Sequence, residues 1–185
     1  HGETYWFDDV IFACHSDQAM KMLDEISPLE QDILGNMTYQ ANEVVLHSDS
    51  SLLPKRKAAW ASWNYLLEGS DSEKQRLPSL TYDMNILQHF DSPHTFCVTL
   101  NSTEQIDENK ILRKFSYDHP VFTTESIAAQ QRRSEIQGVA HTWFCGAYWH
   151  NGFHEDGVRS ALDVVKAMKE KTKAQDVTTL QRGAA

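Results

Sequence analysis

The sequence lacks features that would each mark a class of protein. No apolar run approaches the roughly 20 residues that a helix needs to span a bilayer, so we expect no transmembrane segment. Cysteine is scarce: Cys14, Cys97 and Cys145 are odd in number, and no two of them form a C-x-x-C pair. This pattern predicts reduced, mostly buried thiols in a cytoplasmic protein rather than a disulfide framework.

Positive charge is also in short supply. The chain has 17 Lys and Arg against 26 Asp and Glu, a formal net charge of -9. Such a balance repels phosphate backbones and argues against general nucleic-acid binding. Apolar content is ample, since 41% of the 185 residues are hydrophobic, with five Trp, six Tyr and eight Phe. A folded core is therefore expected, in one large domain or two small ones.

The first residues of the chain carry an α/β pattern. The short apolar run 10–13 is followed by a polar turn and a helical pattern, which predicts a buried strand leading into a helix capped by Ser16 or Asp17. Ser27 and the Pro28 after it predict the start of a second helix, which Gly35 ends.

The last third of the chain carries a similar pattern. Residues 124–137 predict a helix with Gly138 as its stop, and residues 142–148 predict a strand. A final amphipathic helix starts near Asp156, and from Lys171 onward we expect a polar, frayed tail. Five apolar residues on one face of that helix are expected to point inward: Val158, Ala161, Leu162, Val165 and Met168.

The middle of the chain reads as a mostly antiparallel sheet. One predicted strand also suits a helix, namely 80–87. If the segment 59–66 is a strand, Trp60 points to one face of the sheet and Trp63 and Tyr65 point to the other. The aromatic side chains on one face are expected in the core, and those on the other either pack there too or line an apolar cavity. The five predicted strands are 43–47, 59–66, 80–87, 95–100 and 111–117. The two ends of the chain would share one sheet, and the middle would form a separate lobe.

The segment 144–157 holds the densest chemical signal. A buried strand runs into a loop with Gly152 and then into the start of a helix, where free N–H groups and the helix dipole suit an anionic or electron-rich ligand atom. Two interpretations stay open. The glycines either let a ligand approach the backbone or merely make a turn, and Glu155 and Asp156 either face a ligand or merely complement the dipole.

Several blocks of sequence, in order, resemble one known family. These blocks are 7–16, 59–65, 98–101, 119–122, 143–149 and 152–157 with Ser160. Together they are similar to the predicted NAD/FAD-binding proteins of the flavin-containing amine oxidoreductase superfamily. The resemblance covers nearly the whole chain.

The resemblance implies an α/β (α+β) fold, in which the end of a Rossmann-like FAD-binding domain flanks a mostly antiparallel substrate lobe. Residues 1–36 and 139–172 would belong to the FAD-binding domain, 37–138 to the substrate lobe and 173–185 to a flexible tail. FAD would be the cofactor, and a small-molecule or lipid-like compound the substrate. The residues implied to contact FAD are Cys14, His15, Gly146, Ala147, Glu155, Asp156, Gly157 and Val158. No catalytic acid or base is implied.

Two departures from the family pattern are present. Ala147 stands where broader amine oxidases have an acidic residue, and no G-x-G-x-x-G occurs in the chain. The turn that would grip the ADP half of FAD is therefore missing. Because the chain begins at His1, directly before a predicted strand, we expect a fragment whose N-terminal FAD-binding segment lies elsewhere.

Three hypotheses follow. The first is the C-terminal portion of an FAD-dependent oxidoreductase. The second is a stand-alone, non-catalytic binding module of the same fold, which could form a homodimer. The third is a metal-dependent hydrolase built on His150 and His154, which are spaced i, i+4. Gly152 between these histidines opposes a helical metal face, so we expect no metal site.

Overall fold

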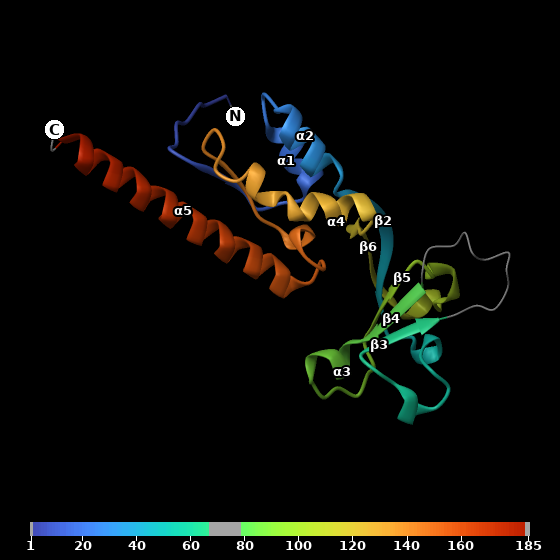
Figure 1. The fold of residues 1–185 in the computed structure, drawn as a ribbon. Helices are drawn as coiled ribbons and strands as arrows, with labels where there is room; N and C mark the ends of the chain where they lie inside the picture. The colour runs from blue at the N-terminus through green and yellow to red at the C-terminus, as the bar shows by residue number, and fades with distance from the viewer. Residues whose placement is uncertain (1, 67–78, 184–185) are drawn as a thin grey trace. The chain divides into compact units, whose positions relative to one another are not determined.

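The structure, a computed structural model, describes residues 2–66 and 79–183 of the chain (Figure 1). The chain divides into two compact units. The terminal unit comprises residues 1–39 and 120–185, and the middle unit comprises residues 40–119. The prediction placed residues 120–138 with the middle lobe, and the structure corrects this boundary. Ala129 and Ile136 from this segment are buried in the core of the terminal unit.

The terminal unit holds a small parallel sheet with helices around it. Strand β1 (Val10–Phe12) pairs in parallel with β7 (Thr142–Phe144), with Val10 opposite Thr142 and Phe12 opposite Phe144. The two ends of the chain therefore share a sheet, as the sequence predicts. The helices of this unit are α1 (Ser16–Met22), α2 (Pro28–Gly35), α4 (Thr124–Gln131) and α5 (His154–Gly183).

The two faces of this sheet are buried against different helices. Phe144 lies in one cluster with the apolar side chains of α1, α2 and α4, and Phe12 stacks on it with ring centroids 5.6 Å apart. Trp143 and Cys145 point to the other face, where Val164 of α5 packs on them. The alternation of residues along a strand thus places consecutive side chains in two separate cores.

Helix α5 differs from its prediction in the face that it buries. Val164 is buried, whereas Val158 and Leu162 are 55% and 63% exposed. The prediction that Val158, Leu162 and Val165 all point inward is therefore wrong, although Ala161 and Met168 do pack on the core. The helix also continues to Gly183, through most of the segment that was expected to fray.

The middle unit is built on a five-stranded sheet in the order β3-β4-β5-β2-β6. The pairs β3–β4, β4–β5 and β5–β2 are antiparallel. The predicted strand 80–87 divides into β4 and the short helix α3, which the Asp83 carboxylate caps by accepting from the Ile86 N–H. The bounds are β2 Thr38–His47, β3 Trp63–Leu66, β4 Ser79–Asp83, α3 Met84–Gln88, β5 Cys97–Leu100 and β6 Ile111–Val121.

The predicted strand 59–66 is shorter than expected. Only Trp63–Leu66 form β3, because residues 57–59 make a turn of 3-10 helix and the Trp60 indole N–H donates to the Pro54 carbonyl. Trp63 packs edge-on against Tyr82, with ring centroids 5.3 Å apart, and Trp63 and Tyr65 are both more than one-third exposed. Residues 68–72, whose Gly, Ser and Asp composition predicts a turn between strands, lie outside the described residues.

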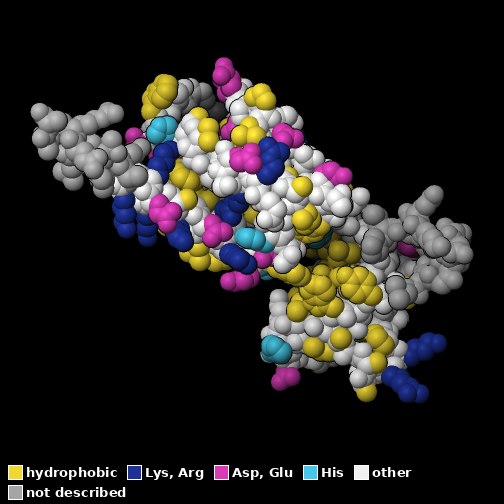
Figure 2. Space-filling model, viewed as in Figure 1, with side chains coloured by type: hydrophobic (Ala, Val, Ile, Leu, Met, Phe, Trp, Pro, Cys, Tyr) yellow, Lys and Arg dark blue, Asp and Glu magenta, His cyan; other side chains and the backbone are white. Residues whose placement is uncertain are grey.

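The thiols are as the sequence predicts. All three cysteines are free; Cys97 and Cys145 are buried and Cys14 is partly buried. Exposed large apolar side chains occur on both units (Figure 2). Among the described helices, none is both long and apolar enough to cross a membrane.

Candidate functional site

The candidate site lies where the two parallel strands of the terminal unit end. Because β1 and β7 are parallel, the residues that follow them come out at the same edge of the sheet. Cys14 and His15 follow β1, and Gly146 and Ala147 follow β7. The structure therefore brings together predicted site residues that are more than 100 positions apart in the sequence. In open α/β sheets this carboxyl edge is where nucleotide ligands bind.

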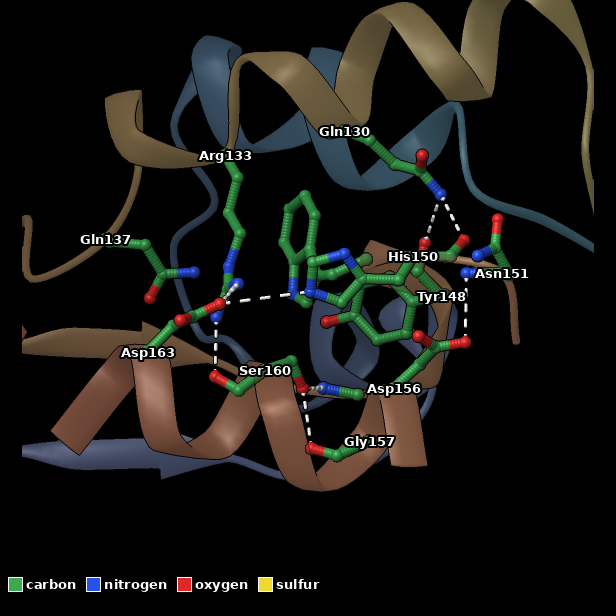
Figure 3. A network of polar contacts seen from close by, with 12 residues as sticks. Gln130, Arg133, Gln137, Tyr148, His150, Asn151, Asp156, Gly157, Ser160 and Asp163 are labelled. Carbon is green, nitrogen blue, oxygen red and sulfur yellow. Dashed lines mark hydrogen bonds and ion pairs between the residues drawn. The ribbon is translucent and has the colours of Figure 1, made fainter. Parts of the chain in front are cut away.

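Helix α5 begins at the same loop, and Asp156 closes its start. The Asp156 Oδ2 accepts from the backbone N–H of Asn151 at 3.1 Å (Figure 3) and from that of Phe153 at 3.0 Å. The carboxylate is nearly buried. Asp156 thus acts as a cap for the loop and the helix dipole, and these two amides are not free for a ligand.

The amide of Gly146 is also used within the chain. It donates to Ser160 Oγ at 2.8 Å, and Ser160 Oγ donates in turn to the Gly157 carbonyl at 2.8 Å (Figure 3). Ser160 is fully buried. These bonds connect the end of β7 to the first turns of α5. The Gly146 N–H, which was expected to contact a ligand, is therefore already used in a hydrogen bond within the chain.

The glycines of the loop have different roles. Gly152 has a φ of 88°, and a Cβ there would lie 3.2 Å from the ring of Phe122, so this turn requires glycine. At Gly157 the nearest atom to such a Cβ is the Ala147 amide nitrogen at 3.9 Å, an ordinary contact. The helix could therefore lie equally close to Ala147 with alanine at position 157, so glycine is not required there.

Two polar side chains that the sequence did not single out support this loop and the start of α5. Gln130 donates to the carbonyls of Tyr148 at 2.8 Å and His150 at 2.7 Å. Arg133 donates to the Asp163 carboxylate at 3.0 Å and to the Ser160 carbonyl at 2.7 Å (Figure 3). Gln130 and Arg133 are spaced i, i+3, and this is the only signal that could have marked them as one inward-facing polar pair.

His15 is held by its neighbours on the β1 side. It is the N-cap residue of α1, where the prediction named Ser16 or Asp17. Its ring stacks on Tyr39 with centroids 4.3 Å apart and planes 11° apart. Ser16 instead is buried, and its backbone N–H donates to the Tyr39 hydroxyl at 2.9 Å. The N-cap is therefore His15, one residue before Ser16, because Ser16 is buried in the core.

The thiols near the site are unsuited to act as nucleophiles. Burial, together with the charge of Asp17, raises the pKa of the Cys14 thiol. Burial likewise raises the pKa of Cys145, although Arg133 partly opposes the shift. Both groups are therefore protonated at neutral pH, as expected for inert thiols. Glu155 and Val158 are the predicted site residues whose side chains are exposed at the start of α5.

The described histidines do not assemble a metal centre. His150 Nε2 lies 3.8 Å from Asp163 Oδ2, and His154 begins α5. Within residues 2–66 and 79–183, no group of three or more His, Cys, Asp or Glu side chains is placed to hold a metal ion. No protein-family model and no curated protein sequence matches the chain.

Proposed function

We propose that this chain is the C-terminal portion of an FAD-dependent, amine-oxidase-like oxidoreductase. The proposal rests on the ordered sequence blocks and on the edge where β1, β7 and the start of α5 meet. FAD would supply hydride transfer when bound. Cys14, His15, Ala147, Glu155 and Val158 border the place for its flavin end. Gly146, Asp156 and Gly157 support that edge through contacts within the chain.

One observation carries the proposal: in the part of the chain that the structure describes, a side chain covers the outer edge of β7, whereas no strand pairs with the outer edge of β1. On the β7 side, the Gln137 side chain accepts from the Phe144 N–H at 3.0 Å and donates to the Phe144 carbonyl at 2.8 Å. On the β1 side, Val10 and Ile11 point to opposite faces, and both are about half exposed, at 44% and 45%.

An open edge with apolar residues on both faces suits a particular partner. Parallel sheets are buried on both faces, and two strands alone make a marginal sheet. The β1 edge therefore suits another strand with helices on both sides, which a dinucleotide-binding segment would supply. That missing N-terminal FAD-binding segment is the partner that we propose.

The middle unit would then hold the substrate. It has an open cavity of about 500 Å3 whose wall includes Leu52, Leu53, Tyr65 and Leu66, with Lys55 beside them. An apolar or lipid-like molecule suits such a lining. No residue is assigned as catalytic acid or base.

Flavin titration tests the proposal. FMN and FAD are added to the purified chain, and quenching of flavin fluorescence is followed. Because the ADP half has no partner here, we expect both to bind weakly and with similar affinity. An α5 control, Glu170→Gln, should bind in the same way as the unmodified chain. A well-folded chain that quenches neither flavin, even at millimolar concentration, would refute the proposal.

A second function, assembly without catalysis, is favoured by the exposed aromatic residues near β1. Tyr5, Trp6 and Phe7 are all more than two-thirds exposed, and they directly precede the open edge. Homodimerisation over this surface would bury them. Light scattering distinguishes the two functions, since a monomer that binds flavin excludes assembly as the main role, and a dimer that ignores flavin excludes the oxidoreductase.

A further inference from the structure

An open cavity of about 510 Å3 lies in the terminal unit, beside α5. Four residues between positions 131 and 137 line it, and so do four residues of α5 between positions 163 and 171. Trp143 of β7 completes the lining. Figure 3 shows Arg133 and Asp163 reaching toward each other from these two segments. The whole cavity therefore belongs to one unit of the chain.

The charged side chains of the cavity leave one positive charge in excess. Arg133 and Asp163 offset each other, because the guanidinium donates to the carboxylate at 3.0 Å. Lys171 is the remaining charged residue of the lining. In the part of the chain that the structure describes, no carboxylate lies within 4.0 Å of its ammonium group. An anion is thus the ligand that would balance the cavity.

Lys171 is held in place but keeps hydrogen-bond donors to spare. Its Nζ donates to the Gly138 carbonyl at 2.8 Å and lies 5.5 Å from the centroid of the Trp143 ring. An ammonium group has three N–H donors, so two remain beyond the bond to Gly138. A carboxylate can accept from them without breaking any bond within the chain, and such a charge-assisted bond is stronger than a neutral one.

The other side of the cavity suits an apolar body. Trp143, Val164 and Ala167 all line it. Val164 packs on Trp143 in the core beneath α5, and Ala167 packs against the same cluster. Apolar walls with a few charged or polar groups are the usual composition of a small-molecule site.

We propose that this cavity binds a small monocarboxylate with an apolar body. The carboxylate pairs with the Lys171 ammonium, and the apolar body packs beside Val164 and Ala167. One excess positive charge matches one carboxylate, whereas the second negative charge of a phosphate monoester would face Asp163 without a partner. The inference goes beyond the proposed function, because none of the residues that border the place for the flavin end lines this cavity.

Calorimetric titration of the purified chain tests the proposal with three compounds. Octanoate and 3-phenylpropanoate carry an alkyl and an aryl body, and octan-1-ol keeps the alkyl chain without the charge. We expect at least one carboxylate to bind saturably to one site, and octan-1-ol to bind at least about tenfold more weakly than octanoate. The tighter of the two carboxylates identifies the body as alkyl or aryl.

Substitution of Lys171 assigns the binding to this cavity. Lys171→Met keeps the length of the side chain and removes its charge, so it should weaken binding of the carboxylate by about tenfold. Lys169→Met changes an exposed lysine of α5 that does not line the cavity, and it should bind as the unmodified chain does. Circular dichroism checks that both variants fold.

A second variant avoids the bond that Lys171 makes to Gly138. Ser134 is exposed and lines the cavity, so its replacement should not disturb folding. Ser134→Glu adds a negative charge there and should weaken carboxylate binding by about threefold or more. Ser134→Gln adds a similar volume without charge and should have little effect.

Three results would overturn the proposal. The first is the absence of saturable binding of either carboxylate up to about 10 mM. The second is equal binding of octanoate and octan-1-ol. The third is unchanged affinity in Lys171→Met or, where that variant does not fold, in Ser134→Glu. Because none of these titrations contains flavin, their failure leaves the proposed function standing, and a chain that ignores FMN and FAD leaves this inference standing.

Discussion

The glycines of the terminal unit are of two kinds: some occupy positions that require glycine, and others occupy positions where alanine would fit as well. Gly138 has a φ of 71°, and a Cβ there would lie 2.6 Å from the Trp143 ring. Gly138→Ala should therefore destabilise the chain by about 2 kcal/mol through backbone strain and overpacking. Urea unfolding followed by Trp fluorescence measures this, and a loss below a few tenths of a kcal/mol would show that the ring moves aside freely.

Gly157 offers the opposite case. It lies in α5, and a Cβ there meets only an ordinary contact at 3.9 Å. Gly157→Ala should stabilise the chain by about 0.5–1 kcal/mol, because alanine loses less backbone entropy on helix formation. The same urea measurement tests it. A destabilised variant would show that Gly157 has a packing role that the structure does not reveal.

The chemistry of individual site residues was only partly readable from the sequence. The start of α5 was predictable to within two residues, since Gly152 and the acidic pair in the first turn of the helix are local signals. The end of β7 was not: the strand stops at Phe144, whereas the prediction ran to residue 148. The partners of the site residues were not predictable either. Asp156 takes the amides of Asn151 and Phe153, and Ser160 takes the amide of Gly146, through contacts that depend on how the loop folds back.

At the scale of elements, the outer edge of β7 depends on one side chain. Gln137→Ala would leave the N–H of the fully buried Phe144 unpaired and its carbonyl with the Trp149 indole N–H alone. The expected loss is about 1–3 kcal/mol for such unsatisfied groups. Gln131→Ala, at an exposed position of α4, is the matched control and should change little. Thermal unfolding compares the two, and equal effects would rule out the role of Gln137 in closing the edge.

The elements themselves were predicted best where the pattern was local. The predicted strand 95–100 and the helix that starts after Ser27 follow from alternation and capping, and both are present, the strand as Cys97–Leu100. The inward face of α5 was predicted wrongly because the sequence alone does not say where Trp143 lies. Val164 meets that ring, so the apolar residues Val158 and Leu162 turn outward.

At the scale of the molecule, the middle unit as a whole should be sensitive to acid. The middle unit contains a buried chain of hydrogen bonds: His47 Nε2 to Thr99 at 2.7 Å, and Thr99 to Thr81 at 2.8 Å. His47 Nδ1 accepts from the Asp49 N–H at 3.1 Å, so the ring is the neutral tautomer with its proton on Nε2. Protonation at Nδ1 would place the new N–H of the ring directly opposite the Asp49 N–H, so that the hydrogen bond between them is lost.

The middle unit should therefore lose stability as the pH falls below about 6.5, the ordinary pKa of histidine. Burial lowers the pKa of His47 in the folded chain, although Asp49 partly opposes the shift. The unfolded chain then binds the proton first, so this contribution is complete above pH 6.5 and is lost towards the lowered pKa. Asp49 adds a second loss at lower pH. Although its burial disfavours the charged carboxylate, the Asp107 and Ser51 amides and Lys110 hold its pKa well below the usual range.

Hydrogen exchange of the β2 and β5 amides between pH 7.5 and 5 measures the first loss, after correction for intrinsic exchange rates. We expect protection to fall over this range in the unmodified chain, and His47→Gln to remove the pH dependence because glutamine does not titrate. His94→Gln, an exposed histidine of the same unit, is the control and should keep the dependence of the unmodified chain. Equal protection at both pH values in the unmodified chain would mean that the neutral His47 ring does not stabilise the sheet. A dependence that survives in His47→Gln would assign the acid response to another group.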